Sequence, residues 1–344
     1  MSRTTDRAGS VVERAGKGRL KAAWTLVLLA PLCAEAAFTG ISLPSIWPAF
    51  PLLVPVYGAG VLLIRELACR AGAGWAGLLV LGVAYELAED GLGLQALTSP
   101  HLYTAAQWGR MLGFNITYWE SQVGYHLVFS LLIPVALTGL IFKRHARRPY
   151  LGTFGLVGTA VVFAAGLALA KVSIAGSQDP GYQTPWPVVA ALLAVIVVLG
   201  VVALVVFPRL RMPRPAPVAR LPRPPVMATV AGIAPIVFLG LLFPLGHNAG
   251  RPAVGHGAWV ALPMAAALVI AVAVGWRIAQ WSASEAFTDR HRVWLIGGAM
   301  VGHSLFAVAS GVAGGNAVLS PVLGLVVIAV TVLLLGRLDR RLAP

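Results

Sequence analysis

The sequence predicts an all-α, polytopic membrane protein with about ten transmembrane helices. Of its 344 residues, 58% are hydrophobic and 11% are charged, whereas soluble domains carry about 25% charged residues. Apolar runs of about 20 residues recur along the whole chain, and each is long enough to cross a hydrocarbon layer of roughly 30 Å as a helix. Together these observations exclude an ordinary soluble core.

The distribution of basic residues predicts the orientation. The chain has 26 Lys and Arg residues and a net charge of +14. Only Arg110, Lys171 and Arg251 fall outside one set of alternate loops, and Lys and Arg concentrate in cytoplasmic loops. We therefore expect both termini to be cytoplasmic in a multi-pass protein of the bacterial cytoplasmic membrane. The lipid bilayer, and not nucleic acid, is the partner that this charge pattern predicts.

The predicted spans divide the chain into four parts. A basic N-terminal segment (1–21) precedes helices 1–6 (22–207), a Pro/Arg-rich cytoplasmic linker (208–225), and helices 7–10 with a short basic tail (226–344). The first apolar run continues past a weak cleavage-like site at Ala34-Glu35-Ala36, so we interpret it as a span and not as a signal peptide. The ten predicted spans are 22–42, 46–64, 74–97, 118–142, 151–174, 186–207, 226–245, 258–276, 293–313 and 317–335.

The third span carries three carboxylates. Glu86, Glu89 and Asp90 stand at relative positions i, i+3 and i+4, which places them on one helix face with Cβ atoms about 5–6 Å apart. An intramembrane charge costs on the order of 2.5–3.5 kcal/mol on insertion scales, and such groups usually face a partner or a water-filled cavity. This face is the strongest functional signal in the chain.

Other polar residues reach the same depth in the membrane. With 1.5 Å of rise per residue, Glu86 lies about 18 Å and Glu35 about 20 Å above the cytoplasmic start of their spans. His126 enters its span from the other side and reaches a similar level, and His303 lies near the middle of the ninth span. We therefore predict a substrate or proton site made of Glu35, Glu86, Glu89, Asp90, His126 and His303.

Several features argue for structure rather than chemistry. We interpret Arg65-Glu66 as an anchoring arginine with a local acidic partner, and the small residues Gly298 and Gly302 as a place where a neighbouring helix approaches closely. Cys33 and Cys69 are not expected to pair, and two isolated cysteines give no metal spacing. The chain has no phosphate-binding Gly-rich loop, so direct ATP use is not expected. Neither a cofactor nor a metal site is assigned from the sequence.

The segment Tyr57-Gly58 … Arg65-Glu66-Leu67 … Gly74-Trp75 … Tyr85 … Glu89-Asp90-Gly91, followed by His126, Ser130 and Pro134, resembles a family of uncharacterised bacterial polytopic membrane proteins. An acidic pair followed by histidines on later helices also resembles, more distantly, the CPBP intramembrane proteases. The pattern of those enzymes is Glu-Glu-x-x-x-Arg, Phe-x-x-x-His and His-x-x-x-Asn or Asp. The motif-completing positions here hold Gly93 or Leu94, Gln122 and Ala307.

Three functions remain open from the sequence. The first is a transporter or permease-like protein, with or without proton coupling, that uses the acidic face as its site. The second, which the CPBP resemblance implies, is an intramembrane hydrolase in which Glu89 activates a water and His126 and His303 assist or hold a metal ion. The third is a non-catalytic scaffold or immunity-type protein whose polar residues only hold helices together. Substrate and oligomeric state are not predicted.

Overall fold

The computed structural model describes residues 18–210, 215–243 and 257–342, which form helices without any β-strand. Eight helices are long and apolar enough to cross a membrane, which confirms the predicted all-α, polytopic class. They correspond to the second and the fourth to tenth predicted spans. The eight are Pro44–Ala71, Ile116–Ile141, Thr153–Gln178, Trp186–Leu210, Pro224–Leu242, Ala258–Ser282, Asp289–Ala313 and Leu319–Leu342.

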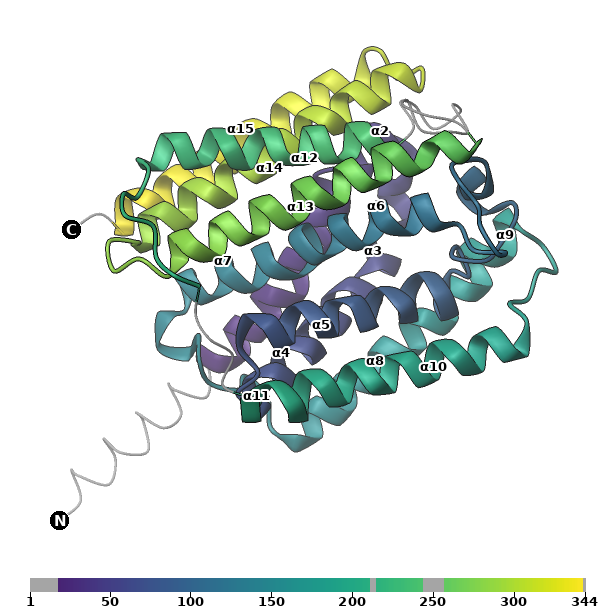
Figure 1. The fold of residues 1–344 in the computed structure, drawn as a ribbon, viewed down its shortest axis with the longest axis horizontal. Coiled ribbons are helices and arrows are strands. Elements are labelled where there is room, and N and C mark those ends of the chain that lie inside the picture. The colour runs from purple at the N-terminus through teal and green to yellow at the C-terminus, as the bar shows by residue number, and fades with distance from the viewer. Residues whose placement is uncertain (1–17, 211–214, 244–256, 343–344) are drawn as a thin grey trace.

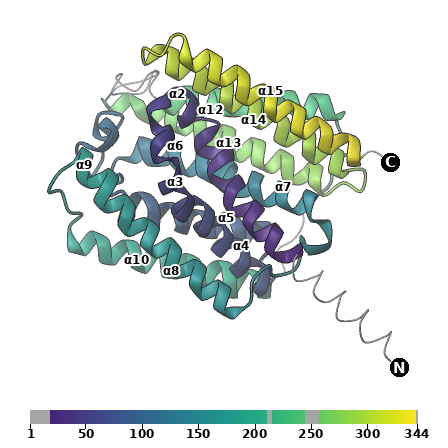
Figure 2. The ribbon, with the colours of Figure 1, turned by 180° about the vertical axis from the view of Figure 1, so that it is seen from behind.

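The two other predicted spans are also helical and run through the same bundle (Figure 2). The first is helical over residues 18–36, turns at 37–38 and continues as α2 (Thr39–Ser42). The third consists of α5 (Gly74–Glu86) and the π-helical turn η4 (Leu87–Gly93), and its three carboxylates make it less apolar than the others. The helices that carry the predicted carboxylates are thus the two predicted spans that are not among these eight.

The acid-bearing helices lie between two groups of helices. In Figure 1, α8 (Thr153–Ala170) and α10 (Trp186–Val201) cover one side, while four C-terminal helices cover the other. Those four are α12 (Pro224–Leu242), α13 (Ala261–Ser282), α14 (Asp289–Ala313) and α15 (Leu319–Leu342). A Cβ atom on Gly302 of α14 would overlap the carbonyl oxygen of Gly232 on α12, so the expected close approach occurs at this pair.

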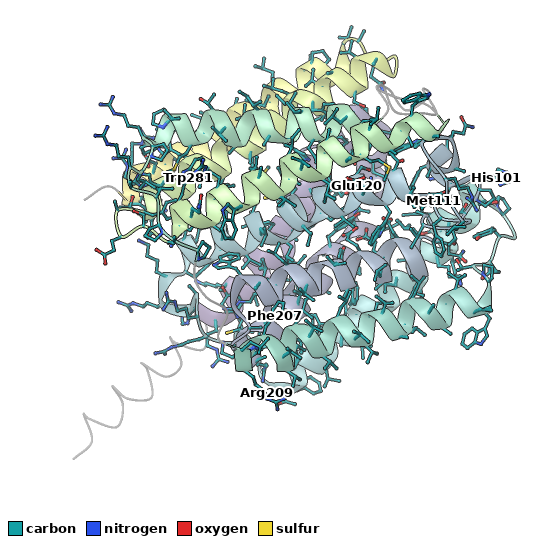
Figure 3. The ribbon with its side chains drawn as sticks, viewed as in Figure 1. His101, Met111, Glu120, Phe207, Arg209 and Trp281 are labelled. Carbon is teal, nitrogen blue, oxygen red and sulfur yellow. The ribbon has the colours of Figure 1, made fainter. Side chains whose placement is uncertain are left out.

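The loops gather at the two ends of the bundle as the predicted alternation requires. The described chain begins and ends at the same end (Figure 1). Ion pairs join helix ends there: Lys143 contacts Asp289 at 2.7 Å and Arg290 contacts Asp339 at 3.0 Å. Figure 3 shows Arg209 and Trp281 toward this end and His101 and Met111 at the opposite one. An even number of crossings accounts for this arrangement.

The connection between the third and fourth predicted spans folds onto the opposite end of the bundle. We call residues 94–115 the capping segment. Its Trp108 is 4% exposed and Asn115 is fully buried, with the Asn115 amide donating to the carbonyls of Ala96 and Ser99 at 2.6 and 2.8 Å. Asp179, from the connection between α8 and α10, accepts hydrogen bonds from Ser99 and His101. The capping segment is therefore an ordered cover over the bundle.

Both cysteines are free, as expected. The predicted linker at 208–225 is helical up to Leu210 and again from Pro224. Residues 211–214 of the linker and 1–17 of the predicted N-terminal segment lie outside the described residues.

Candidate functional site

The three carboxylates of the third span are buried inside the bundle. Glu86 is 0% exposed, and Glu89 and Asp90 are each 2% exposed. The apolar run of α5 inserts this helix among its neighbours, and η4 then carries Glu89 and Asp90 on a widened turn. None of the described Lys and Arg residues forms an ion pair with them. The three acidic groups therefore share a buried volume without a neutralising cation.

Glu35 belongs to the same cluster. It lies in the π-helical turn η1 (Leu32–Ala36) and is 8% exposed. Its carboxylate lies near the side chains of Thr39, Tyr57 and Tyr125, but the Tyr125 hydroxyl makes no hydrogen bond of normal geometry among the described residues. Tyr57 also lies near Glu89, so one phenol stands between the acidic groups of two helices. We call Glu35, Glu86, Glu89 and Asp90 the acidic cluster.

Tyrosines surround the acidic cluster. The Tyr118 hydroxyl donates to Oδ1 of Asp90 at 3.4 Å. The Tyr85 hydroxyl approaches Glu89 without a hydrogen bond of normal geometry. Sequence reasoning did not assign these tyrosines to the site. Their signal was a tyrosine inside an apolar span, where the hydroxyl needs a polar partner once it is buried.

His126 lies against the acidic cluster with a fixed ring. Its Nδ1 forms a 2.7 Å hydrogen bond with Oγ of Ser130, one helical turn further on. The ring stacks on Tyr57 at a centroid distance of 5.2 Å and meets Tyr125 edge-on at 4.6 Å. Ligand atoms of Glu86, Glu89 and His126 lie within 4.8 Å of one another. These three residues could hold a metal ion.

His303 lies in a neighbouring aromatic cage. Its ring is fully buried and stacks on Phe129 at 3.8 Å, with Phe38 at 5.0 Å and Tyr125 at 5.2 Å. Neither ring nitrogen has a hydrogen-bond partner in the described part of the chain. Tyr125 thus contacts both histidines, but His303 is not one of the three residues whose ligand atoms converge.

Several oxygens of the acidic cluster have no partner. Both carboxylate oxygens of Glu86, Oε2 of Glu89 and Oδ2 of Asp90 are buried without a hydrogen bond among the described residues. Most buried polar atoms in proteins are hydrogen-bonded, and each exception needs an explanation. An ion, a proton or a polar substrate at this position would supply one.

Four π-helical turns contribute to or flank the site. Glu35 lies in η1, Tyr57 in η3 (Val54–Ala59) and Glu89 in η4, while His126 immediately precedes η6 (Leu127–Leu132). A π-helical turn inserts an extra residue into an α-helix and occurs frequently at functional sites. Here the turns come from four different helices, and the contacts above join their side chains.

A second buried charged group lies at the end of the bundle where the described chain begins and ends. Glu66 is fully buried and accepts hydrogen bonds from Arg65 at 2.6 Å and from the backbone amides of Tyr150 and Leu151 at 2.7 and 3.1 Å. Arg65 also donates to the carbonyls of His145 and Ala146 and lies 3.5 Å from the centre of the Tyr150 ring. We call Arg65 and Glu66 the loop clamp. The predicted local pair is present, and it also holds a distant loop.

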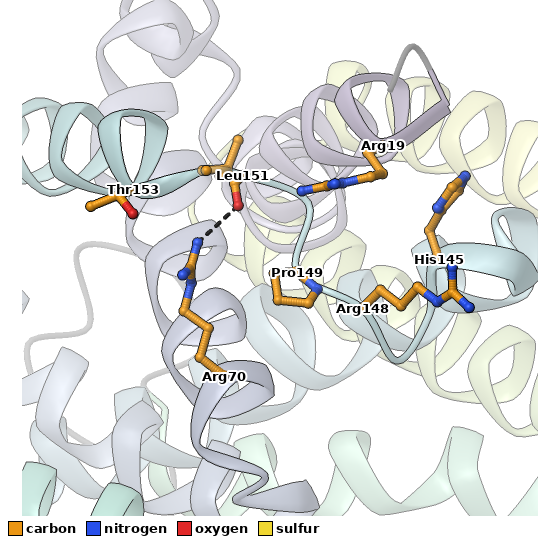
Figure 4. A pocket seen from close by; sticks show the side chains of 8 residues that line it. Arg19, Arg70, His145, Arg148, Pro149, Leu151 and Thr153 are labelled. Carbon is orange, nitrogen blue, oxygen red and sulfur yellow. Dashed lines mark hydrogen bonds between the residues drawn. The ribbon is translucent and has the colours of Figure 1, made fainter. Parts of the chain in front are cut away.

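A basic pocket opens beside the loop clamp. Its volume is about 460 Å³, and Figure 4 shows Arg70 inside it donating to the carbonyl of Leu151 at 2.8 Å. None of the acidic cluster lines this pocket. The residues around it are Arg19, Arg70, His145, Arg148, Pro149, Leu151, Gly152 and Thr153.

Comparison with known proteins identifies a family, and its description names no activity. Residues 25–337 match a family model described as an uncharacterized membrane protein family. No curated protein and no solved structure matches the chain. The match extends over both halves of the bundle and includes every residue of the acidic cluster.

Proposed function

We propose that this chain, which belongs to that uncharacterized membrane protein family, is an integral membrane transporter or permease that binds a cation at the acidic cluster and His126. The cation is either the cargo or a coupling ion, a proton included. One observation carries the proposal: four buried carboxylates lie together with an imidazole and without a basic partner among the described residues. Ionisable groups inside a membrane mark ion pathways and proton relays.

The closed state of the site supports this proposal. Glu86 and Glu89 are buried, and the capping segment covers the bundle end beyond them, where its Tyr103 stacks with Tyr118 at a centroid distance of 6.1 Å. A transporter that alternates access between two sides passes through a state closed to both. The described arrangement fits such an occluded state.

Flux through reconstituted protein tests the proposal. Liposomes carrying the full chain are loaded with pyranine or with a zinc-sensitive dye, and a potassium diffusion potential drives cation entry. We expect entry of H⁺ or Zn²⁺ above empty liposomes, and loss of that entry in Glu89→Gln. Glu120→Gln is the matched control, because Glu120 is a half-buried carboxylate in a neighbouring span and is not among the residues whose ligand atoms converge. Absence of both fluxes from the unmodified chain overturns the proposal.

The convergence of Glu86, Glu89 and His126 also favours a second candidate, an intramembrane hydrolase. Catalytic zinc sites have three protein ligands and an open position for water. The version that requires both histidines finds less support, since His303 lies in its aromatic cage. Proteolysis of a membrane-embedded reporter by reconstituted chain, lost in Glu89→Gln and accompanied by no cation flux, would favour the hydrolase. Unchanged flux and stability in all cluster variants would favour a scaffold.

A further inference from the structure

We infer that Glu86, Glu89 and His126 form a binding site for a divalent first-row transition-metal ion of the Zn²⁺ type. This inference rests on the proposed function, because it names the chemical class of the cation that the same site takes. A bound metal ion differs from a bound proton in the ligand itself, in the number bound per chain and in the residues that binding requires.

The distances between the ligand atoms suit one ion. A carboxylate oxygen from each glutamate and a ring nitrogen of His126 all lie within 4.8 Å of one another. In a tetrahedral site whose ligands each lie about 2.1 Å from the zinc ion, two ligands are about 3.4 Å apart. A contraction of at most about 1.4 Å, which rotation of the two glutamate side chains supplies, brings even the widest pair to this distance.

The surroundings orient the ligands as metal sites require. The 2.7 Å bond of His126 Nδ1 to Ser130 leaves Nε2 as the ligand nitrogen, and rings on two sides fix the imidazole plane. In metalloproteins such outer hydrogen bonds hold histidine ligands in place.

Hydrogen bonding favours a metal over a proton at Glu86. A protonated carboxyl is a donor and needs an acceptor, but neither oxygen of Glu86 has a partner among the described residues. A divalent ion would use such an oxygen as a ligand and would offset two of the four carboxylate charges. None of the described Lys and Arg residues stands within ion-pair distance of Glu86 to do so.

The donor set indicates which ions fit. Imidazole suits Zn²⁺, Fe²⁺, Ni²⁺ and Cu²⁺, whereas Mg²⁺ and Ca²⁺ take all-oxygen sites. One nitrogen with two carboxylate oxygens therefore selects a transition metal over the abundant alkaline-earth ions. Asp90 and Glu35 are not among the three residues whose ligand atoms converge, so they add negative charge near the ion without acting as ligands.

Metal binding by the purified full chain in detergent tests the inference without any flux measurement. Equilibrium dialysis against Zn²⁺, with elemental analysis, should give one ion per chain in the presence of excess Mg²⁺. Glu86→Gln and His126→Gln should each weaken binding at least tenfold. His303→Gln is the matched control, since it makes the same change at an equally buried histidine outside the ligand set, and it should bind Zn²⁺ as the unmodified chain does.

Outcomes separate this inference from the proposed function. Less than one Zn²⁺ per chain, or equal loss in His303→Gln, overturns the metal site, and H⁺ flux that persists would leave the transporter standing. Stoichiometric Zn²⁺ binding without any flux supports the site and overturns the transporter.

If the variants do not fold, the absorption spectrum of Co²⁺ bound to the unmodified chain decides. An absorption spectrum of cobalt with a nitrogen ligand supports the inference, and a spectrum of hexaaqua cobalt overturns it.

Discussion

The loop clamp and the acidic cluster both bury charged groups within helices of one bundle, yet they treat charge in opposite ways. Glu66 is fully buried and has an arginine and two backbone amides as partners. Glu86 is equally buried and has none among the described residues. Both exposures are zero, so burial alone does not distinguish a structural group from a functional one. The number of partners does.

The physical reason lies in the cost of removing charge from water. That cost amounts to several kcal/mol per ion, and attraction between partners recovers it only where the geometry is good and the remaining lone pairs are satisfied. The loop clamp meets both conditions and ties α4 (Gly60–Ala71) to the loop before α8. The acidic cluster meets neither, which is the arrangement expected where the missing partner arrives from outside.

The largest effect that this comparison predicts is at Glu66. Glu66→Gln keeps the shape but leaves the Arg65 guanidinium buried without a counter-ion, since Arg65 is 4% exposed. Breaking a buried pair on one side costs about 3–5 kcal/mol, and we expect the free energy of unfolding in detergent to fall by that amount. Denaturant titration followed by circular dichroism measures it. A loss below about 1 kcal/mol, which is typical of exposed ion pairs, would remove the contrast between the loop clamp and the acidic cluster.

A smaller effect of opposite sign is expected at Glu86. Glu86→Gln makes the same chemical change at the same burial but removes an unpaired acidic group, so the free energy of unfolding should stay equal or rise by about 1 kcal/mol. The same titration in metal-free buffer checks this. A destabilisation as large as that of Glu66→Gln would mean that Glu86 has a structural partner, and the acidic cluster would then be helix packing.

The smallest effect is expected at Asp179, which holds the capping segment from a partly exposed loop. Desolvation acts to raise the pKa of Asp179, but hydrogen bonds from Ser99 and His101 outweigh it and hold the pKa below its usual value. A lowered pKa means that the stabilisation is present above the unfolded value of about 3.9 and is lost as pH falls below it.

Asp179→Asn should therefore loosen the capping segment by about 0.5 kcal/mol at pH 7. Hydrogen exchange of residues 99–104 is the measurement, and the difference between the variant and the unmodified chain should shrink as pH falls below about 3.9 and through the lowered pKa of Asp179. A difference that grows below about pH 3.9 would contradict this assignment of the Asp179 hydrogen bonds.

Hydropathy and charge alternation account for most of the fold. Helix ends such as Trp186 and Ala313 fall where the apolar runs predict them. The folded arrangement of the capping segment is harder to predict from the sequence, because it depends on partners that are distant along the chain. Asp179 lies about 80 residues away from Ser99 along the chain. Likewise the pairing of Arg65 with Glu66 follows from their adjacency, but the contact of Glu66 with Tyr150 does not.

The sequence predicts a depth in the membrane for each residue of the candidate site, but it does not predict which neighbours each side chain meets. The i, i+3 spacing predicted that Glu86 and Glu89 would stand together, and the rise per residue placed His126 at their level. The same argument placed His303 there, but a depth does not specify which neighbour a helix faces. Its ring stacks on Phe129 instead. The role of His303 and of the whole proposed site remains a prediction that the binding experiments address.

The π-helical turns have a consequence for engineering and for comparison between relatives. An α-helix advances about 100° per residue, so one inserted residue sets the two halves of a helix out of phase. Removing a single residue from Leu87–Gly93 would leave α5 in place and turn the rest of the helix by about a quarter revolution, carrying Gly93 away from Leu167, its present neighbour on α8. Single-residue deletions here should therefore be far more damaging than most substitutions.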